Sequence, residues 1–332
     1  MASLVKPYFS MDTMRLGFPV NVLGQPGLKS HDTRRWRNHP HLSVSLAYLR
    51  DIFVYLHRQG IRMYRMASDL APYVTHPDMP WFHSQIDECA TELTVLGETV
   101  KSQRLRLSFH QSLSNVMNAQ DEAIARNSAA QITAQARILE SMGLGPEAVI
   151  VTHVGGVYGD RESALERFTE GYRRLPEFVR RRLALENDDR HFCVADIVHI
   201  HHETEVPLVF DYLHFLNHNA QGIPMMEALD LCLRSWPHGV KPKVHFSSPR
   251  TAMRVIEQTH SETSQKTRRL RAPRPIQHAD FIDPFQFVSF VRAAKDRNLR
   301  AFDVMLEAKA KDLAVLHLRK QMARFAPETM SE

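Results

Sequence analysis

The chain has 332 residues, of which 43% are hydrophobic and 24% charged, and it carries a formal net charge of +5 with a pI of about 9.1. This size allows one large core or two modest domains; no apolar run reaches the roughly 20 residues of a membrane span, and the first residues lack the apolar core of a signal peptide. The three cysteines are far apart, which argues against a disulfide framework and predicts buried thiols in a reducing, cytoplasmic setting.

Short apolar stretches alternate with stretches of helical spacing along the chain. Residues 1–13 are expected to form a flexible tail, and the strand candidates after it are residues 14–18, 61–66, 105–110, 148–153, 182–187, 207–211, 242–246 and 301–307. Helices are expected at residues 42–58, 83–102, 119–142, 162–180, 194–204, 224–236, 284–297 and 311–325. Residues 249–275, between the seventh and eighth strands, form a basic insertion with little expected order.

Eight strands alternating with helices predict a parallel sheet, and eight is the number that closes a (β/α)8 TIM barrel. The competing architecture is a doubly wound open sheet, but no G-x-G-x-x-G phosphate-binding sequence follows the first strand. We therefore predict a single α/β domain, a TIM barrel over residues 14–318, followed by the end of the last helix and a tail at residues 319–332.

Acids and histidines stand at the ends of these strands or just beyond them. The set comprises His110, His153, Glu186, Asp211, His214, His245, His278 and Glu307. In a barrel the strand ends meet at the C-terminal rim, where this fold places its active sites. Three acids and five histidines gathered there would repel one another or stay unsatisfied without cations, and they are too many ligands for one ion. The sequence predicts two or three divalent ions, with Glu186 as the bridge.

Each of these residues could also have an ordinary structural role. A single histidine that ends a strand is more often capped or part of the core. Glu186 could form an ion pair with Arg182, and Asp211 could cap the helix that follows it. Glu307 could pair with Lys309 or Lys311. All of these roles would have to hold together on one rim, which favours the metal interpretation. His31, His39 and His41 lie in a loop with no evident acidic partner and stay unassigned.

Clustered divalent ions on a barrel rim suit either phosphodiester hydrolysis or sugar isomerisation. Residues 268–274 (RRLRAPR) lie in the insertion on the same rim. A solvated loop is the ordinary interpretation of this stretch, but its charge fits a nucleic-acid backbone, for which a small-sugar enzyme has little use. The insertion therefore favours phosphodiester hydrolysis.

With these residues placed, the chain resembles the UV damage endonuclease family, barrel enzymes related to the metal-dependent apurinic endonucleases. The resemblance covers nearly the whole chain, from about residue 14 to residue 309. It rests on residues 15–19 (RLGFP), 75–77 (THP), 107–110 (LSFH), 152–159 (THVGGVYG), 183–188 (LALEND), 211–217 (DYLHFLN), 242–248 (PKVHFSS) and 303–309 (DVMLEAK), in the family's order and spacing.

The resemblance implies a DNA repair nuclease that nicks the backbone immediately 5′ of cyclobutane pyrimidine dimers, 6-4 photoproducts and often abasic sites, by attack of a metal-activated hydroxide on the phosphodiester. It implies two to three divalent ions, manganese first and zinc, cobalt or magnesium as alternatives. The family's metal positions fall on the eight residues named above, and further site positions on His76, Asn21, Tyr158 and Arg274. Damaged double-stranded DNA is the implied partner; no membrane and no obligatory protein partner are expected, and the chain is expected to act as a monomer.

Lys243 stands two residues before His245 on one strand, so both side chains point the same way. An ammonium group beside divalent cations would be repelled. Lys243 is then neutral, turned toward the scissile phosphate, or carboxylated into an anionic ligand as in the family; an ion pair inside the barrel is the ordinary alternative. With Glu186 and His76, it is an expected catalytic residue.

One departure from the family concerns lesion recognition. Family members carry a glutamine and an aromatic residue that wedge into the duplex, and here these positions are Leu113 and Ser114. Gln111 is the candidate substitute, and Phe18 stands where a tyrosine is usual; we keep both as expected DNA contacts. Unstacking a base step costs about a few kcal/mol. We therefore expect 6-4 photoproducts or abasic sites to be cut better, relative to cyclobutane dimers, than by a relative with the full wedge.

The metal ligands are expected to divide among three ions. Glu186 would complete one site with His110 and His153; a second would comprise Asp211, His245 and Glu307, and a third His214 and His278. Two other functions stay open, a metal-dependent sugar isomerase of the same barrel class and a lesion-binding protein without chemistry. A binder would need no acids on a surface that faces DNA, which argues against the second.

Overall fold

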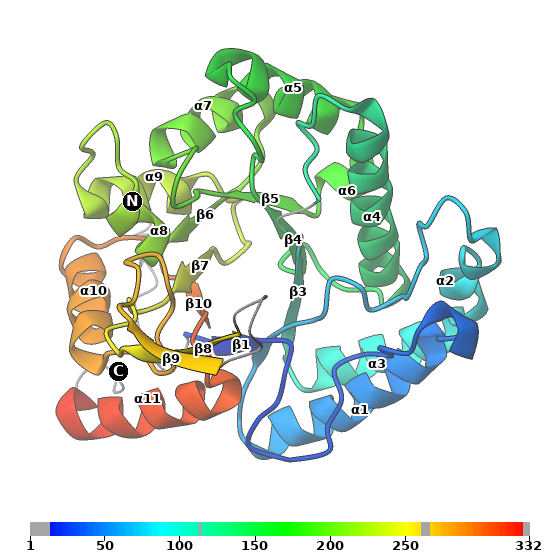
Figure 1. Ribbon diagram of the computed structural model, residues 1–332, viewed down its shortest axis with the longest axis horizontal. Coiled ribbons are helices and arrows are strands. Elements are labelled where there is room, and N and C mark those ends of the chain that lie inside the picture. The colour runs from blue at the N-terminus through cyan, green and yellow to red at the C-terminus, as the bar shows by residue number, and fades with distance from the viewer. Residues whose placement is uncertain (1–13, 113–114, 260–265, 328–332) are drawn as a thin grey trace, which may run out of the picture.

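The computed structural model describes residues 14–112, 115–259 and 266–327. Its centre is a closed barrel of parallel strands in the order β1-β10-β7-β6-β5-β4-β3-β2 (Figure 1). The barrel strands are β1 (Leu16–Pro19), β2 (Met63–Arg65), β3 (Arg106–His110), β4 (Val149–Thr152), β5 (Leu183–Glu186), β6 (Leu208–Asp211), β7 (Lys243–Phe246) and β10 (Asp303–Leu306). The predicted TIM barrel is confirmed, and the open sheet is excluded because β1 pairs with both β2 and β10.

Helices surround the barrel (Figure 1). They are α1 (Leu42–Arg58), α2 (Gln85–Glu88), α3 (Ala90–Ser102), α4 (Glu122–Ser141), α5 (Arg161–Arg174), α6 (Glu177–Arg180), α7 (Val194–Thr204), α8 (Tyr212–Asn217), α9 (Met225–Arg234), α10 (Pro284–Asp296) and α11 (Lys311–Phe325), with 3-10 turns at η1 (Trp36–Asn38) and η2 (Pro80–Phe82). The helix predicted at residues 162–180 breaks at Pro176, as expected of proline. The helix predicted at residues 83–102 is divided at Cys89, whose backbone leaves the helical region. Helix α11 runs unbroken through residue 318, which was expected to end the barrel domain.

Along each barrel strand, side chains alternate between the helix-facing side and the interior of the barrel. In β5, Leu183 and Leu185 belong to the apolar layer shared with the helices, whereas Ala184 belongs to a small separate cluster and Glu186 follows it on the same side. The strand register aligns Glu186 with Val209 of β6, and Asp211 with His245 of β7. The polar residues at the strand ends thus point into the barrel, and the apolar residues beside them hold the helices.

The basic insertion is more ordered than expected. It contains an antiparallel hairpin of β8 (Arg254–Thr259) and β9 (Lys266–Arg271), so the prediction of a low-order loop is wrong. Each strand has several β-branched or long side chains and no proline or glycine, a composition that suits an exposed two-stranded ribbon. The three cysteines are free and buried, as predicted. Among the described helices, none has both the length and the apolar character to cross a membrane.

Candidate metal centre

Six of the eight predicted ligands meet in overlapping groups at the mouth of the barrel. The groups are His110, Glu186 and His245; Glu186, Asp211 and His214; and Asp211, His245 and Glu307, with ligand atoms within 4.8 Å of one another in each. They come from the ends of β3, β5, β6 and β7, from the first turn of α8, and from the residue after β10. The parallel strands bring them together because each ends at the same rim.

Glu186 is the centre of this arrangement. Its fully buried carboxylate lies 2.7 Å from Nε2 of His110 and 2.8 Å from Nδ1 of His245. His153 and His214 are slightly farther away, at 3.6 and 3.5 Å. One carboxylate thus faces four imidazoles that come from four segments of the chain.

The backbone fixes the orientation of four of the histidines. Nδ1 donates to a main-chain carbonyl in His110 (to Gln111), His153 (to Glu186), His214 (to Asn187) and His278 (to Glu307), over 2.7 to 3.3 Å. A carbonyl only accepts, so Nδ1 carries the proton and Nε2 is the atom available to a cation. Backbone contacts of this kind orient metal-binding histidines. In His110, the Nε2 lone pair would face a carboxylate oxygen at 2.7 Å, which requires a proton or a metal ion between them.

Two buried polar atoms of the cluster lack a partner among the described residues. They are Oδ2 of Asp211 and Nε2 of His245, in side chains that are completely buried. The other oxygen of Asp211 caps α8 by accepting from the amide of His214 at 2.7 Å, so the predicted ordinary role and the candidate ligand role coexist. A buried unpaired acceptor is costly, and a divalent ion would satisfy both atoms. The residues present therefore fit divalent metal ions.

Burial and mutual charge shift the pKa values of the cluster in opposite directions. Burial raises the pKa of Asp211 to about 8, against the pull of His214. Burial alone would raise the pKa of Glu186, but His245, His153 and His110 outweigh it and hold that pKa well below its usual range. Burial lowers the pKa of His245 to about 4, whereas the carboxylates around His214 overcome its burial and raise its pKa to about 9. The cluster therefore holds protons that a metal ion must displace.

Lys243 lies one layer deeper in the barrel. It is aligned with Asp303 of β10, two residues before the aligned pair His245 and Met305. The side chain is fully buried, and Nζ donates to Oγ of Ser108 at 2.9 Å. Burial, reinforced by the charges of Arg65 and Arg106, lowers the pKa of Lys243 well below its usual range. Of the predicted alternatives, a neutral amine fits these surroundings best.

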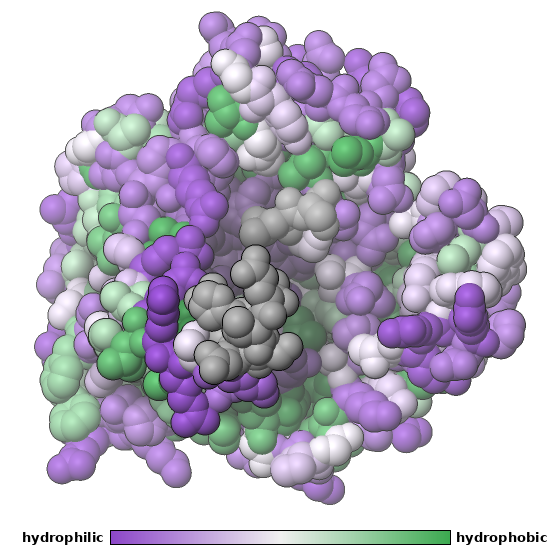
Figure 2. Space-filling model, in the orientation of Figure 1, coloured by the Kyte–Doolittle hydropathy of each residue, from purple (hydrophilic) through white to green (hydrophobic). Residues whose placement is uncertain are grey.

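A hollow of about 610 Å³ opens beside the cluster. Its lining includes three of the predicted ligands, His153, His214 and His278, together with Tyr158 and Asp188. Figure 2 shows that this face of the molecule is hollowed in its middle and bordered largely by hydrophilic residues. His278 joins the cluster from this hollow: its Nδ1 is 3.8 Å from Oε2 of Glu307, and its ring centroid is 6.3 Å from that of His214.

Two predicted DNA contacts belong instead to the interior. Phe18 is completely buried and packs edge-on against Tyr64, because alternation in β1 turns it toward the helices. Gln111 is 4% exposed and donates to Oε1 of Gln135 at 2.6 Å, so its side chain is not available as a wedge. We correct both assignments. The wedge positions Leu113 and Ser114 lie outside the described residues.

Of the remaining predicted positions, three are exposed and the fourth, His76, lies in a separate hollow. Tyr158 is 41% exposed and lines the hollow, and Arg274 is exposed after the hairpin. Asn21 is exposed and accepts from the hydroxyl of Ser30 at 3.3 Å. His76 lines that hollow with Tyr73, and its hydrogen bonds are local, so the structure does not bring it to the carboxylate cluster.

The sequence did not reveal Arg65, which ends β2 and forms an ion pair with Glu307. Like the predicted ligands, Arg65 is a polar residue at a strand end, but an arginine there does not by itself indicate a metal site. The histidines of the loop after the first strand were expected to have no acidic partner, and for two of them this is wrong. His31 lies 3.3 Å from a carboxylate oxygen of Asp69, and His41 lies 2.9 Å from one of Glu88.

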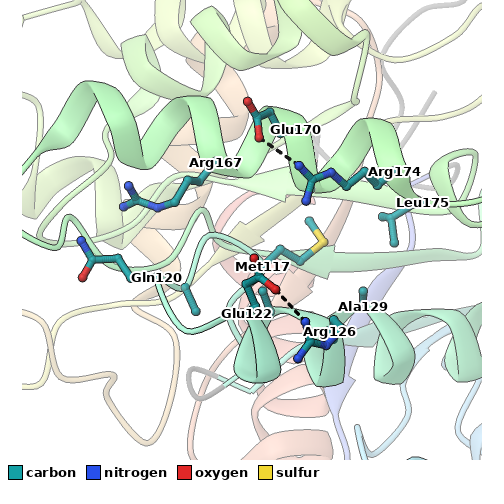
Figure 3. Close-up of a pocket in the computed structure, with 12 residues that line it drawn as sticks. Met117, Gln120, Glu122, Arg126, Ala129, Arg167, Glu170, Arg174 and Leu175 are labelled. Carbon is teal, nitrogen blue, oxygen red and sulfur yellow. Dashed lines mark hydrogen bonds and ion pairs between the residues drawn. The ribbon is translucent and has the colours of Figure 1, made fainter.

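A second hollow, of about 570 Å³, runs down the outside of the barrel between α4 and α5 (Figure 3). Its acids pair with arginines one turn away on their own helices, Glu122 with Arg126 at 2.8 Å and Glu170 with Arg174 at 3.3 Å. Arg167, also in its wall, donates to the carbonyl of Asn118. The two acids are thus already neutralised by arginines, and none of the candidate metal groups among the described residues lies here.

Fold and cluster together define a class: (β/α)8-barrel proteins whose mouth gathers buried carboxylates and imidazoles fit for divalent ions. Within that class, the family model for the UV-endonuclease UvdE matches residues 33–330. A UV DNA damage endonuclease of Bacillus mycoides (strain KBAB4) is 34% identical over 259 residues, which are 78% of this chain and 74% of that protein. One of Bacillus cereus (strain B4264) is 31% identical over 264 residues, with 79% and 76% covered. The chain therefore belongs to the UV-endonuclease UvdE family and is an endonuclease.

Solved structures agree with this assignment. The crystal structure of SacUVDE superposes with a TM-score of 0.76 and 28% identity, over 94% of this chain and 98% of that one. D-psicose 3-epimerase from Clostridium cellulolyticum H10 reaches a TM-score of 0.52 at 12% identity, over 96% of this chain and 100% of that one. At that identity, the second likeness shows the barrel fold alone.

Proposed function

We propose that the chain nicks double-stranded DNA immediately 5′ of UV photoproducts, cyclobutane pyrimidine dimers and 6-4 photoproducts, and that it also cuts at abasic sites. The observation that carries this proposal is the carboxylate and imidazole cluster around Glu186 in a chain of this endonuclease family. Two to three divalent ions, manganese first, are the proposed cofactors; bound there, they would activate a water and neutralise the scissile phosphate. Action as a monomer in the cytoplasm stays a prediction.

The chain's own residues would prepare the site for these ions. Glu186 spans His110 and His245 and is placed to bridge two of them. We propose a small change to the predicted division of the ligands among three ions. His245 lies within reach of both His110 and Glu307, so it could serve either of two ions. His214 lies near Asp211 as well as near His278. The 610 Å³ hollow, lined by Tyr158 and by histidines that include His153, His214 and His278, would receive the nucleotides displaced from the duplex.

Lys243 is proposed to be carboxylated. Burial and the charges of Arg65 and Arg106 lower the pKa of its amine well below the usual range, which favours the neutral form, and only a neutral amine adds CO₂, forming a carbamate and releasing one proton. The carbamate would then accept from Ser108, which now receives the hydrogen bond of the amine. An intact mass one CO₂ heavier under native conditions, lost in Lys243→Arg, is the expected result; an unmodified lysine in the metal-loaded protein would contradict it.

The lesion preference follows from the missing wedge. With Leu113 and Ser114 in place of a glutamine and an aromatic residue, and with Gln111 buried, the chain has less to insert into a stacked duplex. We expect 6-4 photoproducts and abasic sites to be cut faster relative to cyclobutane dimers than by a relative with the full wedge. Side-by-side nicking of defined duplexes measures this, and an equal or reversed preference would refute it.

The decisive experiment is incision of UV-irradiated supercoiled plasmid with manganese, with chelator, and by Glu186→Gln. We expect metal-dependent nicking by the unmodified protein and a loss of at least about a thousandfold in the variant, since a bridging ligand acts only through its charge and both oxygens. Metal content after dialysis should fall in parallel. No metal-dependent nicking by the unmodified protein would end the nuclease proposal, and binding of lesions without nicking would favour the non-catalytic alternative. The sugar isomerase alternative predicts turnover of a ketose and no effect on plasmid.

A further inference from the structure

The β8–β9 hairpin is fixed beside the metal cluster at its base. Pro249 and His278 form an isolated antiparallel bridge, and main-chain hydrogen bonds join Arg250 to Gln277 at 2.6 Å and Ala279 to Ser248 at 2.8 Å. Because His278 is one of the candidate metal ligands, the hairpin starts at the edge of the site. Six residues per strand extend about 20 Å at the spacing of an antiparallel strand, and Figure 1 shows the two strands of the ribbon side by side near β1 and α11.

The register of the hairpin divides its side chains between two faces. Arg254 is opposite Arg271, and Ile256 is opposite Arg269; these lie on one face, which we call the arginine face (Arg254, Arg269 and Arg271). Val255 is opposite Leu270, and Glu257 is opposite Arg268; with Lys266 these lie on the other face, which we call the paired face (Val255, Glu257, Lys266, Arg268 and Leu270).

The two faces differ in charge. On the paired face, Arg268 lies 2.9 Å from Glu257 and is neutralised by it. On the arginine face, three exposed guanidinium groups stand together, and none has a carboxylate within ion-pair distance in the part of the chain that the structure describes. Like charges directly opposite each other destabilise a two-stranded sheet. The pair Arg254 and Arg271 therefore weakens the hairpin unless an anion lies against it.

From this asymmetry, we propose that the arginine face of the hairpin binds the phosphate backbone of the DNA duplex whose damaged part occupies the metal cluster. This rests on the proposed function. Arg269 and Arg271 are two residues apart on one strand, about 7 Å along the ribbon, which lets each take a separate phosphate of one DNA strand. The hairpin would thus hold the duplex on one side of the lesion, at a distance from the site of chemistry.

A pair of charge-matched variants separates this contact from net charge. Arg269→Gln with Arg271→Gln removes two charges of β9 from the arginine face, and Lys266→Gln with Arg268→Gln removes two charges of the same strand from the paired face. Both variants lower the net charge by two, and the second also leaves the carboxylate of Glu257 without its partner, so charge alone would make the second variant at least as unfavourable to DNA binding. All four residues are exposed, and unchanged circular dichroism and thermal unfolding would verify that both variants fold.

The measurement is the affinity of the full chain for a fluorescent lesion-containing duplex over a range of salt concentrations. For the arginine-face variant, we expect affinity to fall roughly tenfold or more at low salt and the slope of log K against log salt to fall by about 2, since each lost phosphate contact removes about 0.9. The paired-face variant should keep both values within about twofold of the unmodified protein, by the same counting.

Three results would overturn the proposal. Equal losses in both variants would mean that only net charge matters, and unchanged affinity in the arginine-face variant would mean that the hairpin does not touch DNA. A larger loss of affinity for single-stranded DNA or RNA than for the duplex would assign the face to another nucleic acid. If the unmodified protein neither binds nor nicks irradiated DNA, the proposed function itself fails, an outcome distinct from normal nicking with two indistinguishable variants.

Discussion

At the scale of single residues, the site uses the two polar atoms of one side chain for two different tasks. Nδ1 of four histidines serves the main chain while Nε2 is left for a cation. One oxygen of Asp211 caps α8, and the other has no partner among the described residues. Such double use fixes the ligands before any ion binds, and the cost is a cluster that retains protons when it is empty.

Those protons predict the pH dependence of metal binding. Asp211 and His214, with pKa values raised to about 8 and about 9, are protonated at pH 7 in the metal-free protein, and both must lose the proton to act as ligands. Metal affinity should therefore rise from pH 6 to pH 9 and level off above, with release of about two protons per chain at pH 7. Calorimetry in buffers of different ionisation enthalpy measures the release. Asp211→Asn should release fewer protons, and an affinity independent of pH would contradict the prediction.

The loop after β4 depends on one glycine. Gly155 has φ +119, and a Cβ there would lie 2.2 Å from Oδ1 of Asn118, a fully buried side chain that holds Gly156 through both its backbone groups. Gly155→Ala should reduce the free energy of unfolding by about 2–4 kcal/mol, because backbone strain and a steric clash add. Gly159→Ala is the matched control: it also has positive φ, but nothing lies within 4 Å of its Cβ. Urea unfolding of both variants measures the two losses in the free energy of unfolding. Equal losses would show that the contact with Asn118 does not matter.

How far the residues of the site could be predicted depended on the argument behind each one. Glu186, Asp211 and His245 were predicted as ligands because they stand at strand ends, and the ends of parallel strands in a barrel meet at one rim. Gln111, one residue past the end of β3, was misassigned because nothing in the sequence determines the direction of a loop side chain. Phe18 was misassigned because a resemblance gives a position and not its burial.

At the scale of elements, the long segment between β1 and α1 is held by Asp32. Its carboxylate accepts from the guanidinium of Arg34 and from the amides of Arg34 and His41, and its own amide donates to Oγ of Ser45. His31 and His41 tie the same segment to residues that follow β2. Ion pairs therefore give this irregular stretch the order that its sequence does not suggest.

This network predicts a stability change with a defined pH dependence. Burial raises the pKa of Asp32, but Arg34 and the two amides outweigh it and lower the pKa below 3.8. The ionised form is thus the stabilising one: its contribution is complete above pH 3.8 and is lost as pH falls through the lowered pKa. Asp32→Asn should cost about 1–3 kcal/mol at pH 7 and progressively less below about pH 4. Urea unfolding across this range tests it; a difference that grows on acidification would be the wrong sign.

The hairpin shows where element prediction failed. Residues 249–275 were expected to have little order. Within them, β8 and β9 pair because they are close in sequence and because the base of the hairpin is closed by the bridge between Pro249 and His278. Pairing between two neighbouring segments thus produces a hairpin even where the sequence pattern of each strand is weak, and composition alone does not reveal such pairing.

At the scale of the whole molecule, the barrel places chemistry at one end and stability at the other. The number of strands was enough to predict the closed barrel, because eight βα units leave few other topologies. The means of closing its N-terminal end were not predictable, because they are single arginines that bind distant carbonyls. Arg182 precedes β5 and donates to carbonyls of the loop before β4, including Leu144 at 2.6 Å. Arg300 precedes β10 and does the same for the loop before β7.

Arg300 therefore offers a test of this division. Its guanidinium donates to the carbonyls of Leu233, Trp236, Pro237 and Val240 over 2.6–3.2 Å, a set that the shorter reach of lysine does not reproduce. Arg300→Lys should lower the free energy of unfolding by about 2–3 kcal/mol, because carbonyls lose charged hydrogen bonds. The rate of DNA nicking at 25 °C should stay unchanged, because the variant lies at the end of the barrel opposite the metal cluster.

Arg297→Lys, an exposed position on the same segment, is the control and should alter neither quantity. Thermal unfolding and plasmid nicking on the same samples separate the outcomes. A nicking rate that falls with stability in Arg300→Lys, well below its unfolding temperature, would show that the two ends of the barrel are coupled.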